Sequence, residues 1–186
     1  MNKYEIKRQA LIAEILANEN DPGRHGKAFE LSCARSLSKK DRVAAQGKFD
    51  IYIKFSRNGK DSYVGAEAKT NGGRVEALLS GENKAKFVIY RLTTVQKHKA
   101  TKSTPAWVEP RVVPALIIPT VLFLQMLKEC NALKEMRHGG IVDGIGIQPT
   151  SKKMYERLTA YGENYPDLLF DKEATYEEWM FEGLEL

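Results

Sequence analysis

The sequence predicts one α/β domain. Its 186 residues suit a single domain of ordinary size. Segments in which apolar and polar residues alternate, as in strands, occur among segments with apolar residues every three or four positions, as in helices. Hydrophobic residues make up 42 % of the chain and charged residues 28 %, which is typical of a globular protein with a core.

Several classes of protein are excluded by composition. The longest apolar stretch, residues 112–127, is interrupted by prolines, so no membrane span is expected. The N-terminus lacks the uninterrupted apolar core of a signal peptide. Cys33 and Cys130 are too few for a disulfide scaffold or a four-thiolate zinc site. We interpret them as reduced, buried thiols of a cytoplasmic protein.

Two helices and a short strand are expected at the N-terminus. The first helix is expected over residues 3–18, with a stripe of small and apolar side chains: Ile6, Ala10, Ala13 and Ala17. Asp21 can cap a second helix and Pro22 is tolerated at its first position, so this helix should run to about Leu37. A short strand is expected at residues 42–45.

A β-hairpin is expected around Asn58-Gly59, a dipeptide that favours two-residue turns. Alternation makes residues 50–55 the first strand and residues 63–70 the returning strand. The turn-forming segment 71–73 then ends the second strand.

The remaining elements follow from similar patterns. They are a brief helix at 75–79, a strand at 86–92, a basic loop or short helix at 93–104, a buried strand at 111–118, a helix at 121–133, a turn-rich linker at 139–146, and two closing helices at 151–161 and 175–184. Thr175 and Glu178 have the spacing of a capping box. We expect the core to span about residues 22–133, followed by a C-terminal helical extension over about 147–186.

One group of residues is a candidate functional site. Along the strand 63–70, alternation places Glu67 and Lys69 on the same face. A two-residue turn at 58–59 makes the numbers of facing residues sum to 117, so Asp50 should face Glu67. Two carboxylates and an ammonium group would then converge on one patch.

Facing carboxylates repel unless a cation or a proton lies between them. Hard oxygen ligands suit Mg²⁺ or Mn²⁺, and a neighbouring lysine can orient a water molecule or offset charge on a phosphate. The alternative is a hairpin with a solvated face on which Glu67 and Lys69 are ordinary surface charges.

The order of these residues resembles the PD-(D/E)XK, or restriction-endonuclease-like, nuclease superfamily. Asp50 precedes Glu67-Ala68-Lys69, and Glu30 lies in the preceding helix. The segment 26–30 is similar to the first-helix segment of the resolvase and phage-nuclease branches. The resemblance covers about residues 22–92 and implies a mixed central β-sheet flanked by helices. Phe49 departs from the family pattern, which has a proline before the aspartate.

The resemblance also implies roles for the residues. Asp50 and Glu67 would be ligands of Mg²⁺ or Mn²⁺, and Ala68 would contribute its backbone carbonyl. Glu30 would complete the shell directly or through water. Lys69 would be the catalytic lysine that positions the attacking water.

The charge distribution favours a polyanionic partner. The first 110 residues carry 21 Lys and Arg against 12 Asp and Glu, whereas the rest carries 8 against 12. Arg74 follows a glycine-rich turn and is expected to approach a phosphate, as are Lys97, Lys99 and Lys102. The three lysines are expected to contact the nucleic-acid backbone, because their segment has no aromatic platform and no arginine for reading base edges.

The sequence therefore predicts a Mg²⁺-dependent DNA endonuclease. Two alternatives stay open: a DNA-binding module of the same fold that does not cleave, and a protein-interaction domain in which the Glu-Ala-Lys tripeptide is incidental. The DNA substrate also stays open between a specific site, a junction, an end and a single strand.

The C-terminal segment, Tyr165 to Leu186, is both acidic and aromatic. Four apolar side chains fall on one helical stripe: Tyr176, Trp179, Met180 and Leu184. We expect this segment to dock as a helix on its own domain or on the second subunit of a homodimer. The alternative is an electrostatic plug over the DNA-binding surface.

Overall fold

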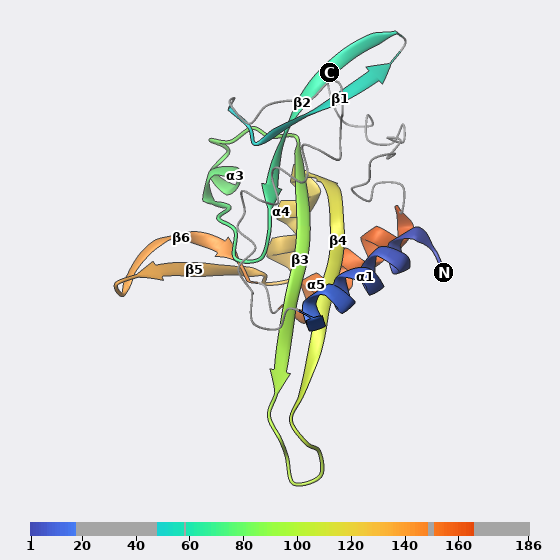
Figure 1. The fold of residues 1–186 in the computed structure, drawn as a ribbon. Helices are drawn as coiled ribbons and strands as arrows, with labels where there is room; N and C mark the ends of the chain where they lie inside the picture. Colours follow the sequence, from blue (N-terminus) through green and yellow to red (C-terminus); the bar gives the residue numbers. More distant parts are fainter. Residues whose placement is uncertain (18–47, 58, 149–150, 166–186) are drawn as a thin grey trace.

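The computed structural model describes residues 1–17, 48–57, 59–148 and 151–165. In chain order the elements are α1 (Lys3–Ala17), β1 (Ile51–Arg57), β2 (Lys60–Lys69), α3 (Glu76–Ser80), β3 (Phe87–His98), β4 (Trp107–Pro119), α4 (Thr120–Glu129), β5 (Leu133–His138), β6 (Ile141–Ile147) and α5 (Lys152–Asn164) (Figure 1). None of the helices in these ranges has the length and apolar character needed to cross a membrane.

The central sheet is mixed, with strand order β1-β2-β3-β4. β1 and β2 form the expected antiparallel hairpin, β3 lies parallel to β2, and β4 lies antiparallel to β3. The parallel step needs a crossover, which α3 provides. Beyond the last β2–β3 pair, the Asn71 side chain donates to the Thr93 carbonyl and accepts from the Thr93 N–H, which extends the pairing. The α/β class with a mixed sheet and flanking helices is confirmed.

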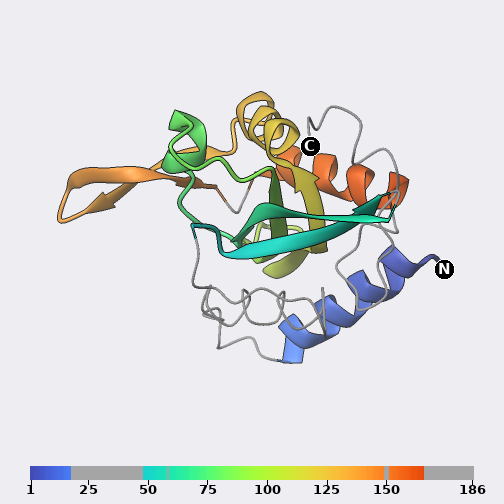
Figure 2. The same ribbon diagram turned by 90° about the horizontal axis from the view of Figure 1, so that it is seen from above.

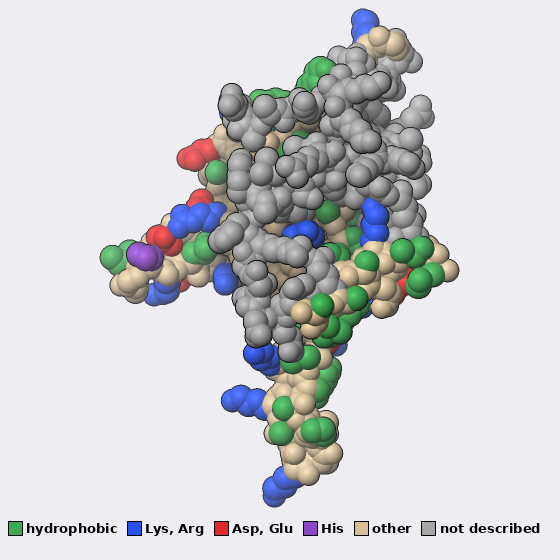
Figure 3. All heavy atoms as spheres, in the orientation of Figure 1, with side chains coloured by type: hydrophobic (Ala, Val, Ile, Leu, Met, Phe, Trp, Pro, Cys, Tyr) green, Lys and Arg blue, Asp and Glu red, His purple; other side chains and the backbone are tan. Residues whose placement is uncertain are grey.

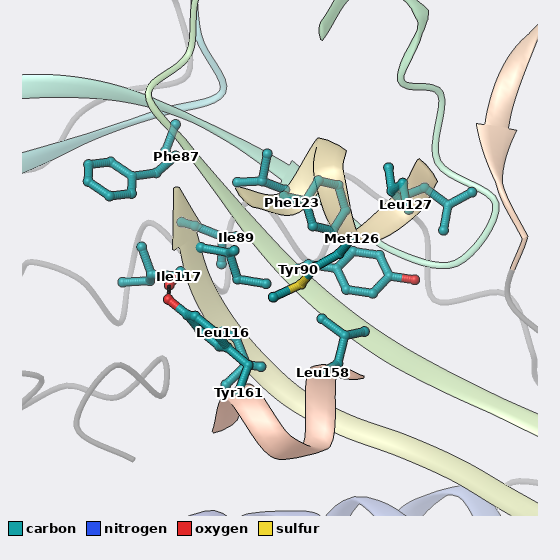
Figure 4. Packing of buried hydrophobic residues seen from close by; sticks show 14 of the residues in the cluster. Phe87, Ile89, Tyr90, Leu116, Ile117, Phe123, Met126, Leu127, Leu158 and Tyr161 are labelled. Atoms are coloured by element: carbon teal, nitrogen blue, oxygen red, sulfur yellow. Dashed lines mark hydrogen bonds between the residues drawn. The ribbon is translucent and has the colours of Figure 1, made fainter. Parts of the chain in front are cut away.

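Helices cover both faces of this sheet. Figure 2 shows α4 and α5 on one side and α1 on the other. Tyr90 of β3 packs on Phe123 of α4, with ring centroids 5.2 Å apart. Leu158 and Tyr161 of α5 lie against the same face of β3 and β4 (Figure 4). The strand interiors and these helices therefore form one hydrophobic core.

The buried face of α1 differs from the expected one. The stripe predicted from the sequence is exposed: Ile6, Ala10, Ala13 and Ala17. Tyr4 is instead fully buried, and its ring packs against Gly162 of α5, where a Cβ would lie 2.3 Å from Tyr4 Cε2. Burial raises the pKa of Tyr4 to about 12. Tyr4 was overlooked because the helix has apolar residues on most of its circumference, so periodicity alone did not select one face.

β4 is an edge strand, and α5 protects it. The Tyr161 hydroxyl donates a buried hydrogen bond to the Ile117 carbonyl (3.1 Å). Met154, Leu158 and Tyr161 are all buried against the sheet. An edge strand presents unpaired polar groups that can recruit other strands, and this contact occupies one of them. α5 therefore belongs to the same hydrophobic core as the sheet.

Residues 93–104 were predicted to be a loop or a short helix, which is wrong for residues 93–98, since these belong to β3, whereas residues 99–104 lie in the loop before β4. β3 continues to His98 and pairs with β4 as far as Trp107. We call residues 95–110 the arm; none of them is buried, and they project from the body (Figure 1). Both faces of the hairpin are exposed in the arm, so both carry polar residues. The alternation of apolar and polar residues that identifies a strand is therefore absent.

Two further predictions, both for the segment after β4, are wrong. The predicted linker 139–146 contains most of β6, which forms a second hairpin with β5. The helix predicted over 121–133 ends at Glu129. Asn131 adopts a left-handed conformation (φ 49°), and the Ala132 N–H bonds back to the Leu127 carbonyl (2.9 Å), which closes the helix.

Candidate functional site

The pairing of β1 with β2 places Asp50 opposite Glu67. Ile51 pairs with Ala66, so facing residue numbers sum to 117, and the predicted register is confirmed. Asp50 lies one residue before β1, at the position that faces Glu67. The two-residue turn fixes this register, because a shift of one residue would move Ile51 and Ile53, both buried, to the other face.

The Asp50 carboxylate bonds to β2 at the point where the backbone pairing of β1 and β2 ends. Its Oδ2 accepts a hydrogen bond from the Ala68 N–H (3.0 Å), the next amide on that edge of β2 beyond the Ile51–Ala66 pair. In a strand the carbonyl of a residue points to the same side as its N–H. The Ala68 carbonyl therefore lies on the edge of β2 that Asp50 occupies.

Lys69 joins the two carboxylates. Its Nζ lies 2.8 Å from Glu67 Oε2 and 4.0 Å from Asp50 Oδ2. The three side chains are 18 %, 9 % and 26 % exposed for Lys69, Glu67 and Asp50, so the cluster is only partly open to water. Lys69 pairs with Tyr90, which packs on α4, so Glu67 and Lys69 point to the face of the sheet that carries α4.

Glu67 is held as a carboxylate. Burial raises its pKa, but the hydrogen bond and the charge of Lys69, together with a hydrogen bond from the Asn83 amide, outweigh this effect. The net result is a pKa below the usual value of 4.5. A buried, ionised glutamate beside a second carboxylate is an electrostatic arrangement that favours a bound cation.

Asn83 was not expected from the sequence. It follows α3, which ends at Ser80 and is capped by Gly81 in the left-handed conformation. Its Oδ1 accepts from the Ala85 N–H (2.9 Å), which leaves the amide NH₂ to donate to Glu67. No local pattern links residues 67 and 83, because only the crossover through α3 brings them together.

Phe49 and Gly65 support the position of Asp50. A Cβ at Gly65 would lie 2.2 Å from Phe49 Cδ2, so the ring packs directly on the glycine backbone. The Phe49 ring also meets Tyr52 edge-on, with centroids 5.6 Å apart. These contacts hold the bend immediately before Asp50.

No protein-family model, curated protein or solved structure matches this chain. The interpretation of the cluster therefore depends on its own geometry and charge.

The described ranges contain no group of three or more His, Cys, Asp or Glu side chains that could hold a metal. The donors present are Asp50, Glu67 and the Ala68 carbonyl. This set fits Mg²⁺ or Mn²⁺, which use one or two carboxylates and complete their shell with water and phosphate oxygens. Glu30, the segment 26–30 and Cys33 lie outside the described residues.

The predicted phosphate contacts lie in two different places. Arg74 pairs with Asp143 (Nη2 to Oδ2, 2.6 Å) and with Glu76 (Nη1 to Oε1, 3.3 Å), so its charge is offset locally. Lys97, Lys99 and Lys102 are exposed on the arm. Lys97 lies seven residues beyond Tyr90, the partner of Lys69, which is roughly 23 Å along the strand.

Proposed function

We propose that this chain is a metal-dependent nuclease that hydrolyses phosphodiester bonds in DNA, with a core of the PD-(D/E)XK type. The observation that carries this proposal is the convergence of Asp50, Glu67 and Lys69 at the end of the β1–β2 ladder. The parallel step from β2 through α3 to β3 supports it, because it gives Glu67 a buried, hydrogen-bonded position.

Each residue has a role in this proposal. Asp50 and Glu67, with the Ala68 carbonyl, would hold the cation. When bound, Mg²⁺ or Mn²⁺ supplies Lewis-acid polarisation of the phosphate. Lys69 donates hydrogen bonds that orient the attacking water, and its charge offsets the negative charge that grows on the phosphate oxygens.

The test is cleavage of supercoiled plasmid in Mg²⁺ or Mn²⁺ by the full chain and three variants. Asp50→Asn and Glu67→Gln should each lower the rate at least about 100-fold, since each removes a charged ligand. Glu82→Gln, at an exposed glutamate after α3, is the matched control and should cleave as the wild type does. Titration calorimetry with Mn²⁺ should show binding in the wild type and Glu82→Gln only.

The same ion pair favours a second candidate, a DNA-binding module that does not cleave. Lys69 offsets the charge of Glu67 directly, with Nζ 2.8 Å from Glu67 Oε2. This candidate predicts no cleavage and no Mn²⁺ binding, together with salt-sensitive DNA binding. Absence of both cleavage and DNA binding would contradict both candidates and leave a protein-interaction domain.

A further inference from the structure

The arm carries an exposed aromatic pair that the core does not need. His98 and Trp107 face each other across the β3–β4 hairpin, with ring centroids 4.0 Å apart and an angle of 4° between the ring planes. Trp107, at the start of β4, lies far from the buried strand interiors and is 48 % exposed. One face of the Trp107 ring is covered by His98, which leaves the other face open on the arm.

The pair is held in place by a chain of polar contacts that begins in the body. Arg111, which is buried, lies 3.4 Å from Glu109, and Glu109 lies 3.1 Å from His98 Nε2. The hydrogen bond with His98 and the charge of Arg111 lower the pKa of Glu109, so His98 Nε2 donates to a carboxylate. The histidine ring is thereby fixed beneath the tryptophan, which lowers the entropy cost of stacking another ring on the pair.

The charge around this platform is positive. Glu109 is the single acidic residue between positions 87 and 119 in the sequence, and it is paired with Arg111 and His98. Lys97, Lys99 and Lys102 are exposed within about ten residues of Trp107 in the sequence. Figure 3 shows basic side chains along one side and at the tip of the arm. A flat aromatic face beside lysines is complementary to a base and its neighbouring phosphates.

We infer that the arm binds single-stranded DNA by stacking an unpaired base on Trp107, while Lys99 and Lys102 contact the adjacent phosphates. Bases within a duplex are already stacked on both faces and cannot cover Trp107 without being unstacked. The substrate of the proposed nuclease is then DNA with a single-stranded segment, and this assignment of substrate rests on the proposed function. Binding by the arm does not depend on cleavage.

The experiment compares a labelled oligonucleotide of about 12 thymidines, within the site sizes of single-strand binders, with a duplex of the same length. Fluorescence anisotropy is measured for the full chain, Trp107→Ala, Trp107→Phe and Tyr63→Ala. Tyr63 is the matched control, because it is an exposed aromatic (53 %) on β2, away from the arm. Thermal melting of each variant checks that it folds.

We expect Trp107→Ala to weaken single-strand binding about ten-fold and duplex binding less than two-fold, because loss of stacking affects unpaired bases alone. Trp107→Phe should restore most of the affinity, and Tyr63→Ala should bind as the wild type does. Equal loss for both DNAs, or no loss for either, would overturn the inference.

The plasmid assay separates this inference from the proposed function. Trp107-dependent single-strand binding by a chain that cleaves no DNA would refute the nuclease and keep the arm as a single-strand binder. Conversely, Glu67-dependent cleavage with single-strand affinity unchanged in Trp107→Ala would keep the nuclease and refute the role of the arm.

Discussion

Lys69 stabilises two carboxylates that would otherwise repel each other at the end of the β1–β2 hairpin. The sign of the pH dependence follows from Glu67, whose pKa is lowered in the folded chain. This lowered pKa contributes stability that is present above the usual value of 4.5 and is lost as the pH falls through the folded value. The cluster therefore stabilises the fold at neutral pH and loses that contribution in acid.

Lys69→Met should destabilise the chain by about 3 kcal/mol at neutral pH, because it leaves the buried Glu67 carboxylate unpaired. The loss should shrink in acid, below the usual pKa of 4.5, because the unpaired Glu67 carboxylate of the variant can then take up a proton. Urea unfolding at neutral and at acid pH measures the difference. The double variant Lys69→Met with Glu67→Gln should be closer to the wild type, and an equal loss at every pH would show that the ion pair is not responsible.

Gly65→Ala tests the support beneath Asp50. The new Cβ would lie 2.2 Å from the Phe49 ring, so the ring must move, at a cost of about 1–3 kcal/mol. The bend that holds Asp50 would shift with it. Urea unfolding of Gly65→Ala, Phe49→Ala and the double variant should show strong coupling, since the alanine at position 49 relieves the clash. Additive losses would indicate that Phe49 does not pack on Gly65.

At the scale of elements, the arm is the feature that the sequence identified least well. Its lysines were found, but the stacking of His98, which lies among them, on Trp107 was not predicted. A two-residue turn fixes the register of β1 and β2, whereas residues 99–106 between β3 and β4 form a longer loop that fixes none. The partner of His98 could therefore not be assigned without the structure.

The second hairpin was missed for a different reason. β6 contains Gly144 and Gly146, which weaken a strand pattern. Both glycines are in close contact with other side chains: a Cβ at Gly144 would lie 2.9 Å from Glu76 Oε1, and a Cβ at Gly146 would lie 2.8 Å from Met136 Sδ, so a larger residue would require these side chains to move. Contacts with residues distant in sequence therefore favour glycine in β6, and these glycines hide the local pattern of a strand.

Replacing Lys97, Lys99 and Lys102 together by alanine should flatten the salt dependence of DNA binding. Each phosphate contact contributes about 0.7 to the slope of log K against log salt for single strands, so three contacts correspond to a decrease of about 2. The lysines are exposed, so the melting temperature should stay within a few degrees. An unchanged slope would place the arm away from the DNA.

At the scale of the whole molecule, the sequence predicted the class of fold and the meeting of Asp50 with Glu67. Both follow from local rules, namely strand alternation and turn geometry. The packing of α1 and the support from Asn83 could not be predicted, since they depend on contacts across the sheet and through the crossover. The C-terminal helix expected at 175–184 lies outside the described residues.

Leu158→Ala tests whether α5 shares the cooperative core. Leu158 is fully buried in the core, so its truncation should cost about 3 kcal/mol and lower the temperature of a single unfolding transition. Glu156→Ala, at an exposed position of the same helix, is the control and should have a small effect. A second, separate transition in Leu158→Ala would show that α5 unfolds independently of the sheet.

The hydrogen bond from Tyr161 to the Ile117 carbonyl has a consequence for synthesis of the chain. β4 leaves the ribosome before α5, so during translation its outer edge is open while the strand itself is already apolar. A ribosome that stalls between these elements would hold a sheet with an uncovered edge, the form most prone to pair with another nascent chain. Slow translation after β4 has emerged from the ribosome and before α5 has emerged should therefore lower the yield of folded protein most.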